Sequence, residues 1–185
     1  SFFGGGTDYP VWYKENKETV NKRFNVFTNK SQIMEKKKVL ICGVTGFIGR
    51  NIAESLAERE DFEVTGVYHK RQKFNNEKIN FVEADLTKKE DVERVVLGQD
   101  VIIQMAATTS GAKDIISQPY IFVTDNVVMN SLILRAAYNN KIKNFIFPSC
   151  TLMYQSSPIS LKETDFDANK HLYKNYFGPG WTKIY

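Results

Sequence analysis

Three glycines near residue 45 have the spacing of a phosphate-binding turn. They stand at G-x-x-G-x-x-G intervals directly after the apolar run at residues 39–41. The first glycine allows a tight turn, the second lets the backbone approach a pyrophosphate, and the third lets a following helix pack on the strand. The start of that helix offers N–H groups and a positive dipole end to phosphate. Because a strand is expected before the glycines and a helix after them, the pattern predicts a dinucleotide site rather than an unrelated glycine-rich loop. The predicted cofactor-binding residues of this turn are Gly43, Gly46, Phe47, Ile48 and Gly49.

Basic residues follow the second expected strand, at residues 63–68. The strand runs into His69, Lys70 and Arg71, and no carboxylate closes it. An acidic side chain at this place holds the ribose 2′-hydroxyl of NAD, whereas cations favour the 2′-phosphate of NADP. The sequence therefore favours NADP(H). NAD(H) stays open, because ordinary solvated charges in a loop would give the same pattern.

Apolar periodicity predicts the helices that must position these groups. Ile48 and Leu56 belong to a series with a four-residue interval after the glycines, which indicates one apolar helix face. Residues 87–90, TKKE, have the form of a capping box, so a second helix is predicted to begin there. A long helix is predicted at residues 126–139, with Leu134 among its apolar positions.

Short apolar runs between the helices predict parallel strands. Strand–helix alternation at this spacing implies right-handed crossovers. The expected fold is α/β, a Rossmann-type doubly wound parallel sheet in a three-layer α/β/α sandwich. Ala106 and Ala107 follow the fourth strand, where small residues let a cofactor lie across the carboxyl edge of the sheet. After the first strand, the others are expected at residues 63–68, 79–83, 100–105 and 144–147.

Composition limits the classes of protein that fit. The 185 residues are 42% hydrophobic and 25% charged, which is typical of one globular domain. The net charge is only +4, and the basic residues are mostly spread among acidic ones, so no nucleic-acid partner is expected. No apolar run approaches the ~20 residues of a membrane span, and no signal segment opens the chain. Cys42 is expected to be a free buried thiol in a reducing cytoplasm.

Four motifs occur in the order found in one known family. They are GVTGFIG, EADLT, the Ala-Ala pair after the fourth strand, and NVVMNSLILRAAYNNKIKNFIFPSC. This set resembles the extended short-chain dehydrogenase/reductase family of NAD-dependent epimerases, dehydratases and reductases of nucleotide sugars. The resemblance covers nearly all of residues 38–185. It implies that Asp85 and Leu86 lie at the adenine, and that Ala106 and Ala107 lie beside the nicotinamide.

The same resemblance implies which residues carry the chemistry. The family uses a Tyr hydroxyl as general acid or base, a Lys that lowers its pKa, and a Ser or Thr hydroxyl that binds the same substrate oxygen. Lys183 is placed as the family lysine, which also holds the nicotinamide ribose. The family's spacing puts Cys150 at the hydroxyl position. Because a thiol is a weaker donor, Ser149 or Thr151 would be the alternative.

The catalytic tyrosine departs from the family pattern. The signature Y-x-x-x-K places Tyr and Lys one helical turn apart. Pro179 stands four residues before Lys183, and Tyr176 stands seven before it. Pro179 suits the first turn of a helix, so Tyr176 is expected just outside that helix. A Gly-Pro-Gly loop could return Tyr176 toward Lys183, and Tyr173 is a weaker substitute.

Both ends of the chain differ from a complete family member. Residues 3–10, FGGGTDYP, resemble the start of GHMP-type heptose-phosphate kinases, and residues 17–37 are polar and Lys/Asn-rich. We expect residues 1–37 to be a poorly ordered kinase-like remnant or linker, with a docked aromatic arm as the alternative. Residues 38–185 are expected to be an NAD(P)-binding domain that lacks its C-terminal substrate lobe, and therefore to be inactive alone.

The predicted function is that of an NAD(P)-dependent nucleotide-sugar epimerase, dehydratase or reductase, as a cytoplasmic cofactor-binding half. The alternative is a non-catalytic NAD(P)-binding module, which the missing tyrosine favours. The expected partners are a nucleotide sugar or related carbohydrate and a second copy in a homodimer. No nucleic acid, membrane or metal is expected.

Overall fold

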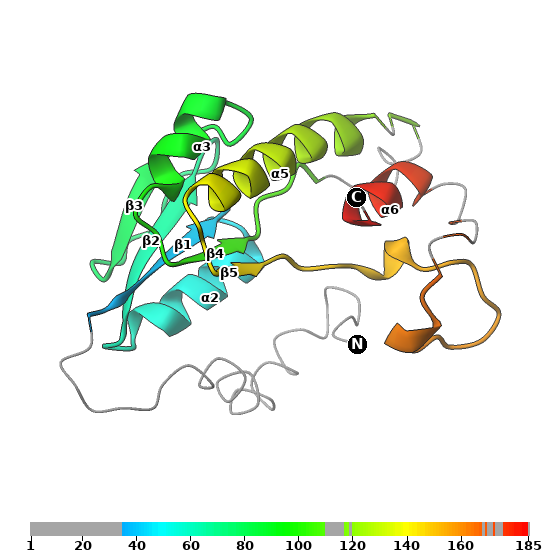
Figure 1. Ribbon diagram of the computed structural model, residues 1–185, viewed down its shortest axis with the longest axis horizontal. Helices are drawn as coiled ribbons and strands as arrows, with labels where there is room; N and C mark the ends of the chain where they lie inside the picture. The colour runs from blue at the N-terminus through cyan, green and yellow to red at the C-terminus, as the bar shows by residue number, and fades with distance from the viewer. Residues whose placement is uncertain are drawn as a thin grey trace.

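The computed structural model describes residues 35–109, 117–118, 120–167, 169, 172 and 176–184. In this part of the chain, five strands form one parallel sheet in the order β3-β2-β1-β4-β5 (Figure 1). The strands are β1 (Lys37–Cys42), β2 (Phe62–Tyr68), β3 (Ile79–Glu83), β4 (Val101–Gln104) and β5 (Asn144–Ile146). The strand order reverses beside β1, which confirms the predicted doubly wound Rossmann-type sheet.

Helices cover both faces of the sheet and make the predicted three layers (Figure 1). Helix α2 (Phe47–Ala57) lies on one face. Helices α3 (Lys89–Val96) and α5 (Ile121–Asn139) lie together on the other. The short helices η1 (Thr151–Met153) and η2 (Glu163–Asp165) follow β5, and α6 (Phe177–Ile184) packs against α5 and η1.

Strand β1 is the centre of the core, because side chains alternate between the two faces of a strand. Val39 and Ile41 belong to the cluster beneath α2. Leu40 and Cys42 belong to the cluster beneath α3 and α5. All four are exposed by 1% or less, as expected for a parallel strand covered on both faces.

The second predicted helix begins within residues 87–90, as expected, but the predicted capping box is wrong. Helix α3 has Lys88 as its N-cap residue, and no side chain caps it. The Thr87 hydroxyl instead donates to Asp85 Oδ1 at 2.7 Å, so it orders the turn before the helix. Helix α5 begins earlier than predicted, at Ile121 instead of residue 126.

Two residues predicted on apolar helix faces are partly exposed. Ile48 in α2 is 38% exposed, and Leu134 in α5 is 48% exposed. Helix α2 packs on the sheet through Gly49, Ala53 and Leu56, so its buried face is turned away from Ile48. The apolar periodicity predicted where the helix lies. Which of its faces is buried depends on the close packing of Gly49 against the backbone of Gly43.

Candidate functional site

The glycine-rich turn closes tightly against the carboxyl ends of the neighbouring strands. Gly43 has φ +75°, a left-handed conformation that glycine adopts without steric cost. A Cβ built on Gly43 would lie 2.6 Å from the Cα of Ala106, just beyond β4. The amides of Gly43 and Val44 both donate to the carbonyl of Val67 in β2, at 3.1 and 3.0 Å. The turn therefore brings the ends of β1, β2 and β4 together.

Helix α2 begins at this turn with its positive end uncompensated. Its N-cap residue, Gly46, is extended and carries no side-chain cap, and its first turn holds no acidic residue. Gly49 is buried, and a Cβ there would collide with the carbonyl oxygen of Gly43. Because no side chain caps the first N–H groups of the helix and no carboxylate in its first turn would repel an anion, the turn fits the pyrophosphate of a dinucleotide.

The predicted cations lie beside this turn. His69, Lys70 and Arg71 are all exposed. The Arg71 guanidinium donates to the carbonyl of Thr45 at 3.1 Å, across the mouth of the glycine-rich turn. The structure thus brings the residues after β2 and the glycine turn together.

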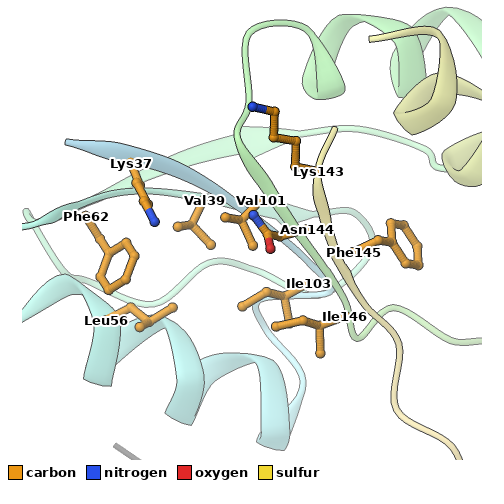
Figure 2. Close-up of a pocket in the computed structure, with 10 residues that line it drawn as sticks. All are labelled: Lys37, Val39, Leu56, Phe62, Val101, Ile103, Lys143, Asn144, Phe145 and Ile146. Atoms are coloured by element: carbon orange, nitrogen blue, oxygen red, sulfur yellow. The ribbon is translucent and has the colours of Figure 1, made fainter. Parts of the chain in front are cut away.

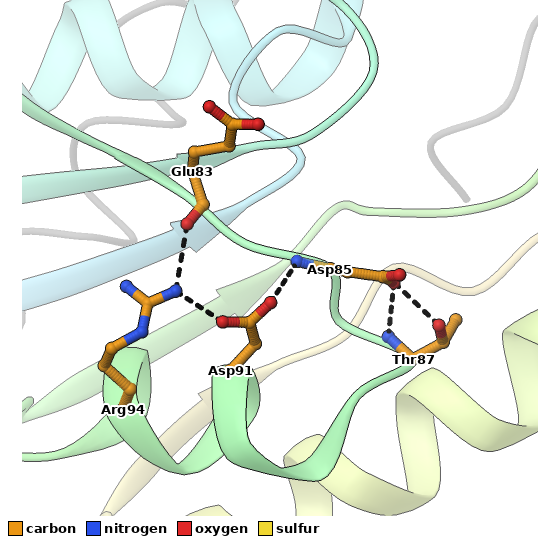
Figure 3. Close-up of polar contacts among 5 residues, drawn as sticks. All are labelled: Glu83, Asp85, Thr87, Asp91 and Arg94. Atoms are coloured by element: carbon orange, nitrogen blue, oxygen red, sulfur yellow. Dashed lines mark hydrogen bonds and ion pairs between the residues drawn. The ribbon is translucent and has the colours of Figure 1, made fainter.

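The two residues predicted at the adenine have different surroundings (Figure 3). Asp85 Oδ1 accepts hydrogen bonds from the N–H and hydroxyl of Thr87, at 3.1 and 2.7 Å. The Thr87 hydroxyl, with smaller contributions from the Thr87 N–H and the charges of His69 and Lys88, holds the pKa of Asp85 below its usual range. Leu86 is only 6% exposed and belongs to the core, so its side chain serves packing.

Buried amide side chains order the segment after β4, and the sequence reasoning missed them. Gln104 is 1% exposed, and its amide accepts from the N–H of Ala106 and donates to the Ala106 carbonyl. The same amide donates to Asn130 in α5 at 2.9 Å. Asn126, one turn earlier in α5, bonds both the N–H and the carbonyl of Thr108. The sequence did contain features that could have predicted these contacts: a glutamine inside an apolar strand, and two asparagines four residues apart in the long helix.

Lys183 in α6 reaches the segment that follows β5. Its ammonium donates to the carbonyl of Pro148 at 3.0 Å and lies 4.2 Å from the centroid of the Phe147 ring. Burial lowers the pKa of Lys183, and Cys150 opposes that shift. Of the predicted hydroxyl donors, Ser149 contacts Met153 Sδ, and Thr151 is the first residue of η1. The structure therefore brings the predicted lysine to the predicted Ser-Cys-Thr segment.

Tyr176 is placed differently from a tyrosine one turn before the lysine. It directly precedes α6, and the Gly-Pro-Gly segment lies inside that helix instead of forming a loop. Seven residues of helix correspond to about 10 Å along the axis, and helical side chains tilt toward the N-terminus. Tyr176 therefore stands about two helical turns before Lys183 along the chain, instead of one. Pro179 is buried, and its carbonyl accepts from the Thr182 hydroxyl at 2.7 Å. Tyr173 lies outside the described residues.

A cavity of about 220 Å³ lies between α2 and the strands β1, β4 and β5 (Figure 2). Lys37 and Phe62 line it from the starts of β1 and β2, and Val101 lines it from the start of β4. Leu56 contributes from the last turn of α2. Nucleotides bind outside the carboxyl ends of the strands in this fold, and no residue of the glycine turn lines the cavity, so it is separate from the cofactor site.

The described residues hold neither a candidate metal site nor a membrane-spanning helix. No group of three or more His, Cys, Asp or Glu side chains there could hold a metal ion. None of the helices in the same residues is long and apolar enough to cross a membrane.

Comparison with known proteins identifies curated relatives that match part of this chain. The chain is 27% identical over 138 residues to GDP-mannose 3,5-epimerase 1 of Oryza sativa subsp. japonica, an alignment that covers 71% of this chain and 36% of the relative. It is 26% identical over 124 residues to GDP-L-fucose synthase of Sinorhizobium fredii (strain NBRC 101917 / NGR234), covering 66% of this chain and 35% of that protein. The chain thus spans about a third of the length of these relatives.

A solved structure and a family match agree with these relatives. PbgP3 protein from Burkholderia pseudomallei superimposes with a TM-score of 0.70 at 29% identity, covering 81% of this chain and 46% of that one. The NAD dependent epimerase/dehydratase family matches residues 39–176, from β1 to the residue before α6. The matched residues include the glycine turn, Asp85 and the Ser-Cys-Thr segment. The chain belongs to the NAD dependent epimerase/dehydratase family.

Proposed function

We propose that this chain is the cofactor-binding part of an NAD(P)-dependent enzyme that epimerises, dehydrates or reduces a nucleotide sugar. The observation that carries the proposal is the convergence of the glycine turn, Arg71 and Asp85 at one edge of the sheet. Relatives named for GDP-mannose and GDP-L-fucose chemistry support a nucleotide-sugar substrate. The chain's small share of their length supports a substrate lobe outside these residues.

The residues divide the proposed work between binding and proton transfer. The glycine turn and the start of α2 bind the pyrophosphate, and Ala106 and Ala107 leave room for the nicotinamide half. A bound nicotinamide dinucleotide supplies hydride transfer. Lys183 holds the nicotinamide ribose and lowers the pKa of a tyrosine, for which Tyr176 is the candidate. Ser149, Cys150 or Thr151 donates a hydrogen bond to the substrate oxygen.

NADP(H) is the favoured cofactor. Arg71 lies across the glycine turn, and His69 is close enough to Asp85 to affect its pKa. These cations would surround a 2′-phosphate on the adenosine ribose. NAD(H) is the alternative, which the same titration tests.

A non-catalytic NAD(P)-binding module is the second candidate function. Pro179 is buried at the position where the family signature requires a tyrosine, and Tyr176 stands about two turns from Lys183. In this second function the chain would keep the cofactor half and would lack the tyrosine that transfers the proton. Restoring the signature with Pro179→Tyr and assaying nucleotide-sugar turnover in the presence of a substrate lobe would distinguish the two functions.

Three further features belong to the same proposal. Val128, Leu134 and Tyr138 are exposed on α5 by 45%, 48% and 81%, and this apolar surface would form a homodimer interface. A cytoplasmic location would supply NAD(P)H and keep the two free thiols reduced. The kinase-like remnant or linker predicted over residues 1–37 would end before Lys37, because Lys37 already pairs with Phe62 in the sheet, and its residues 1–34 lie outside the described residues.

The deciding experiment is a titration of the 185-residue chain with NADPH and NADH, followed by nicotinamide fluorescence. We expect both to bind, with NADPH the tighter. Circular dichroism of the same sample separates loss of folding from loss of binding. A folded chain that binds neither dinucleotide would contradict the proposed function.

A further inference from the structure

The turn between β3 and α3 is held by two side chains from α3 (Figure 3). Arg94 Nη2 donates to the carbonyl of Glu83 at 3.0 Å and to Asp91 Oδ1 at 2.5 Å. Asp91 Oδ2 accepts the N–H of Asp85 at 2.9 Å. Both residues therefore reach back from the helix to the backbone at the carboxyl end of β3.

Three successive backbone groups are fixed at this point. Glu83 and Asp85 are bonded by Arg94 and Asp91, and between them the N–H of Ala84 donates to the Tyr68 carbonyl of β2 at 3.0 Å. The chain direction after β3 is thus set on both sides. Because Asp85 leaves the sheet here, the direction of its carboxylate depends on these bonds.

Only one of the two oxygens of the Asp85 carboxylate accepts hydrogen bonds from the described residues. Its Oδ1 accepts two hydrogen bonds from Thr87, whereas Oδ2 accepts none within the described part of the chain. The pKa of Asp85 lies below its usual range, first because of the Thr87 hydroxyl, so the group is charged at neutral pH. A charged acceptor with a free oxygen suits the exocyclic amino group of adenine.

The Asp91–Arg94 ion pair contributes little to the stability of the whole fold. Their side chains are 28% and 51% exposed, and ion pairs between exposed side chains contribute little to stability. The pair's distinctive feature is its contact with the turn backbone. A second pair on the same helix, Lys89–Glu93 at 3.7 Å, has exposed side chains and no bond to the turn.

We propose that Asp91 and Arg94 are positioning residues for the adenine half of the cofactor site, acting through the backbone of Glu83 and Asp85. The inference rests on the proposed function, because it needs the nicotinamide dinucleotide at this edge. Neither residue touches the ligand. Together they aim the free oxygen of Asp85, and so make binding selective for the 6-amino group of adenine.

The test compares NADH with its reduced hypoxanthine analogue, in which the 6-amino group is replaced by oxygen. We expect the wild-type chain to prefer NADH about tenfold, the worth of one hydrogen bond to a charged group. Asp91→Ala and Arg94→Ala should reduce this preference to about twofold, with unchanged affinity for the hypoxanthine form. Asp91→Asn keeps an acceptor for the Asp85 N–H and should retain most of the preference.

Glu93→Ala is the matched control, because it removes an exposed ion pair from the same helix without freeing the turn. It should keep the full preference for NADH. A second readout is amide hydrogen exchange by NMR. The Asp85 N–H should exchange faster in Asp91→Ala than in the wild type, and at the wild-type rate in Glu93→Ala.

Several outcomes would overturn the inference. They are an unchanged preference in Asp91→Ala, an equal loss of affinity for both analogues, or a protected Asp85 amide in that variant. Failure of the proposed function has a different signature, since the wild-type chain would then bind neither dinucleotide.

Discussion

Replacing Gly43 with alanine tests the geometry on which the whole site depends. A Cβ at this position would lie 2.6 Å from Ala106 Cα and 2.7 Å from Ala106 N. Carbon atoms in contact normally lie about 3.5–4.0 Å apart, so the end of β4 would have to shift by about 1 Å. The contacted atoms are backbone, so no side-chain rotation can relieve the clash.

Gly98→Ala separates the clash from the cost of the backbone conformation. Gly98 has φ +74°, nearly the same as Gly43, but a Cβ there meets nothing within 4 Å. The left-handed conformation alone should lower the free energy of unfolding by about 1–2 kcal/mol in either variant. Forcing a methyl group against β4 should add about 1–3 kcal/mol for Gly43→Ala.

Urea unfolding of the two variants and the wild type measures this difference directly. We expect Gly43→Ala to lose about 1–3 kcal/mol more than Gly98→Ala, with equal m-values. NADPH affinity should fall only in Gly43→Ala, because only that substitution moves the cofactor edge. Equal losses of stability in the two variants would refute the close approach of the turn to β4.

Four further predictions concern titration, thiol reactivity and cofactor specificity. Burial lowers the pKa of Lys183 below its usual value of 10.5. At pH values between the two, the unfolded chain binds more protons than the folded chain, so the contribution of Lys183 to the free energy of unfolding should rise with pH. Lys183→Met should abolish this rise in a pH series of urea midpoints. Burial raises the pKa of Cys42 from 9.0 to about 12, so this thiol's contribution to stability should be lost as pH rises through that interval and the loss should be absent in Cys42→Ala. In the native protein at neutral pH, maleimide should modify the half-buried Cys150 and spare Cys42; modification of Cys42 first would contradict its burial. Arg71→Ala should lower the ratio of NADPH to NADH affinity roughly tenfold, and an unchanged ratio would exclude Arg71 from the 2′-phosphate site.

Local sequence was sufficient for the fold class because the signals were short-range. Apolar runs and helical periodicity identified the strands and the principal helices, and three glycines identified the turn between β1 and α2. Helix faces were less predictable, since Ile48 fits the four-residue series but lies outside the buried face that Gly49 sets. Thr87 has the residue type of a helix cap, yet its hydroxyl bonds Asp85 instead.

The sequence by itself determined that a buried strand, a glycine turn and a helix follow one another, because each depends on neighbouring residues. Only the tertiary structure decided which distant groups meet. Lys183 reaches Pro148 from 35 residues away, and Gln104 bonds Asn130 across 26 residues. The spacing of Tyr176 from Lys183 was visible in the sequence, but its consequence depended on whether the intervening residues formed a loop. The structure makes them helical, and a helix fixes residues seven apart at about 10 Å along its axis.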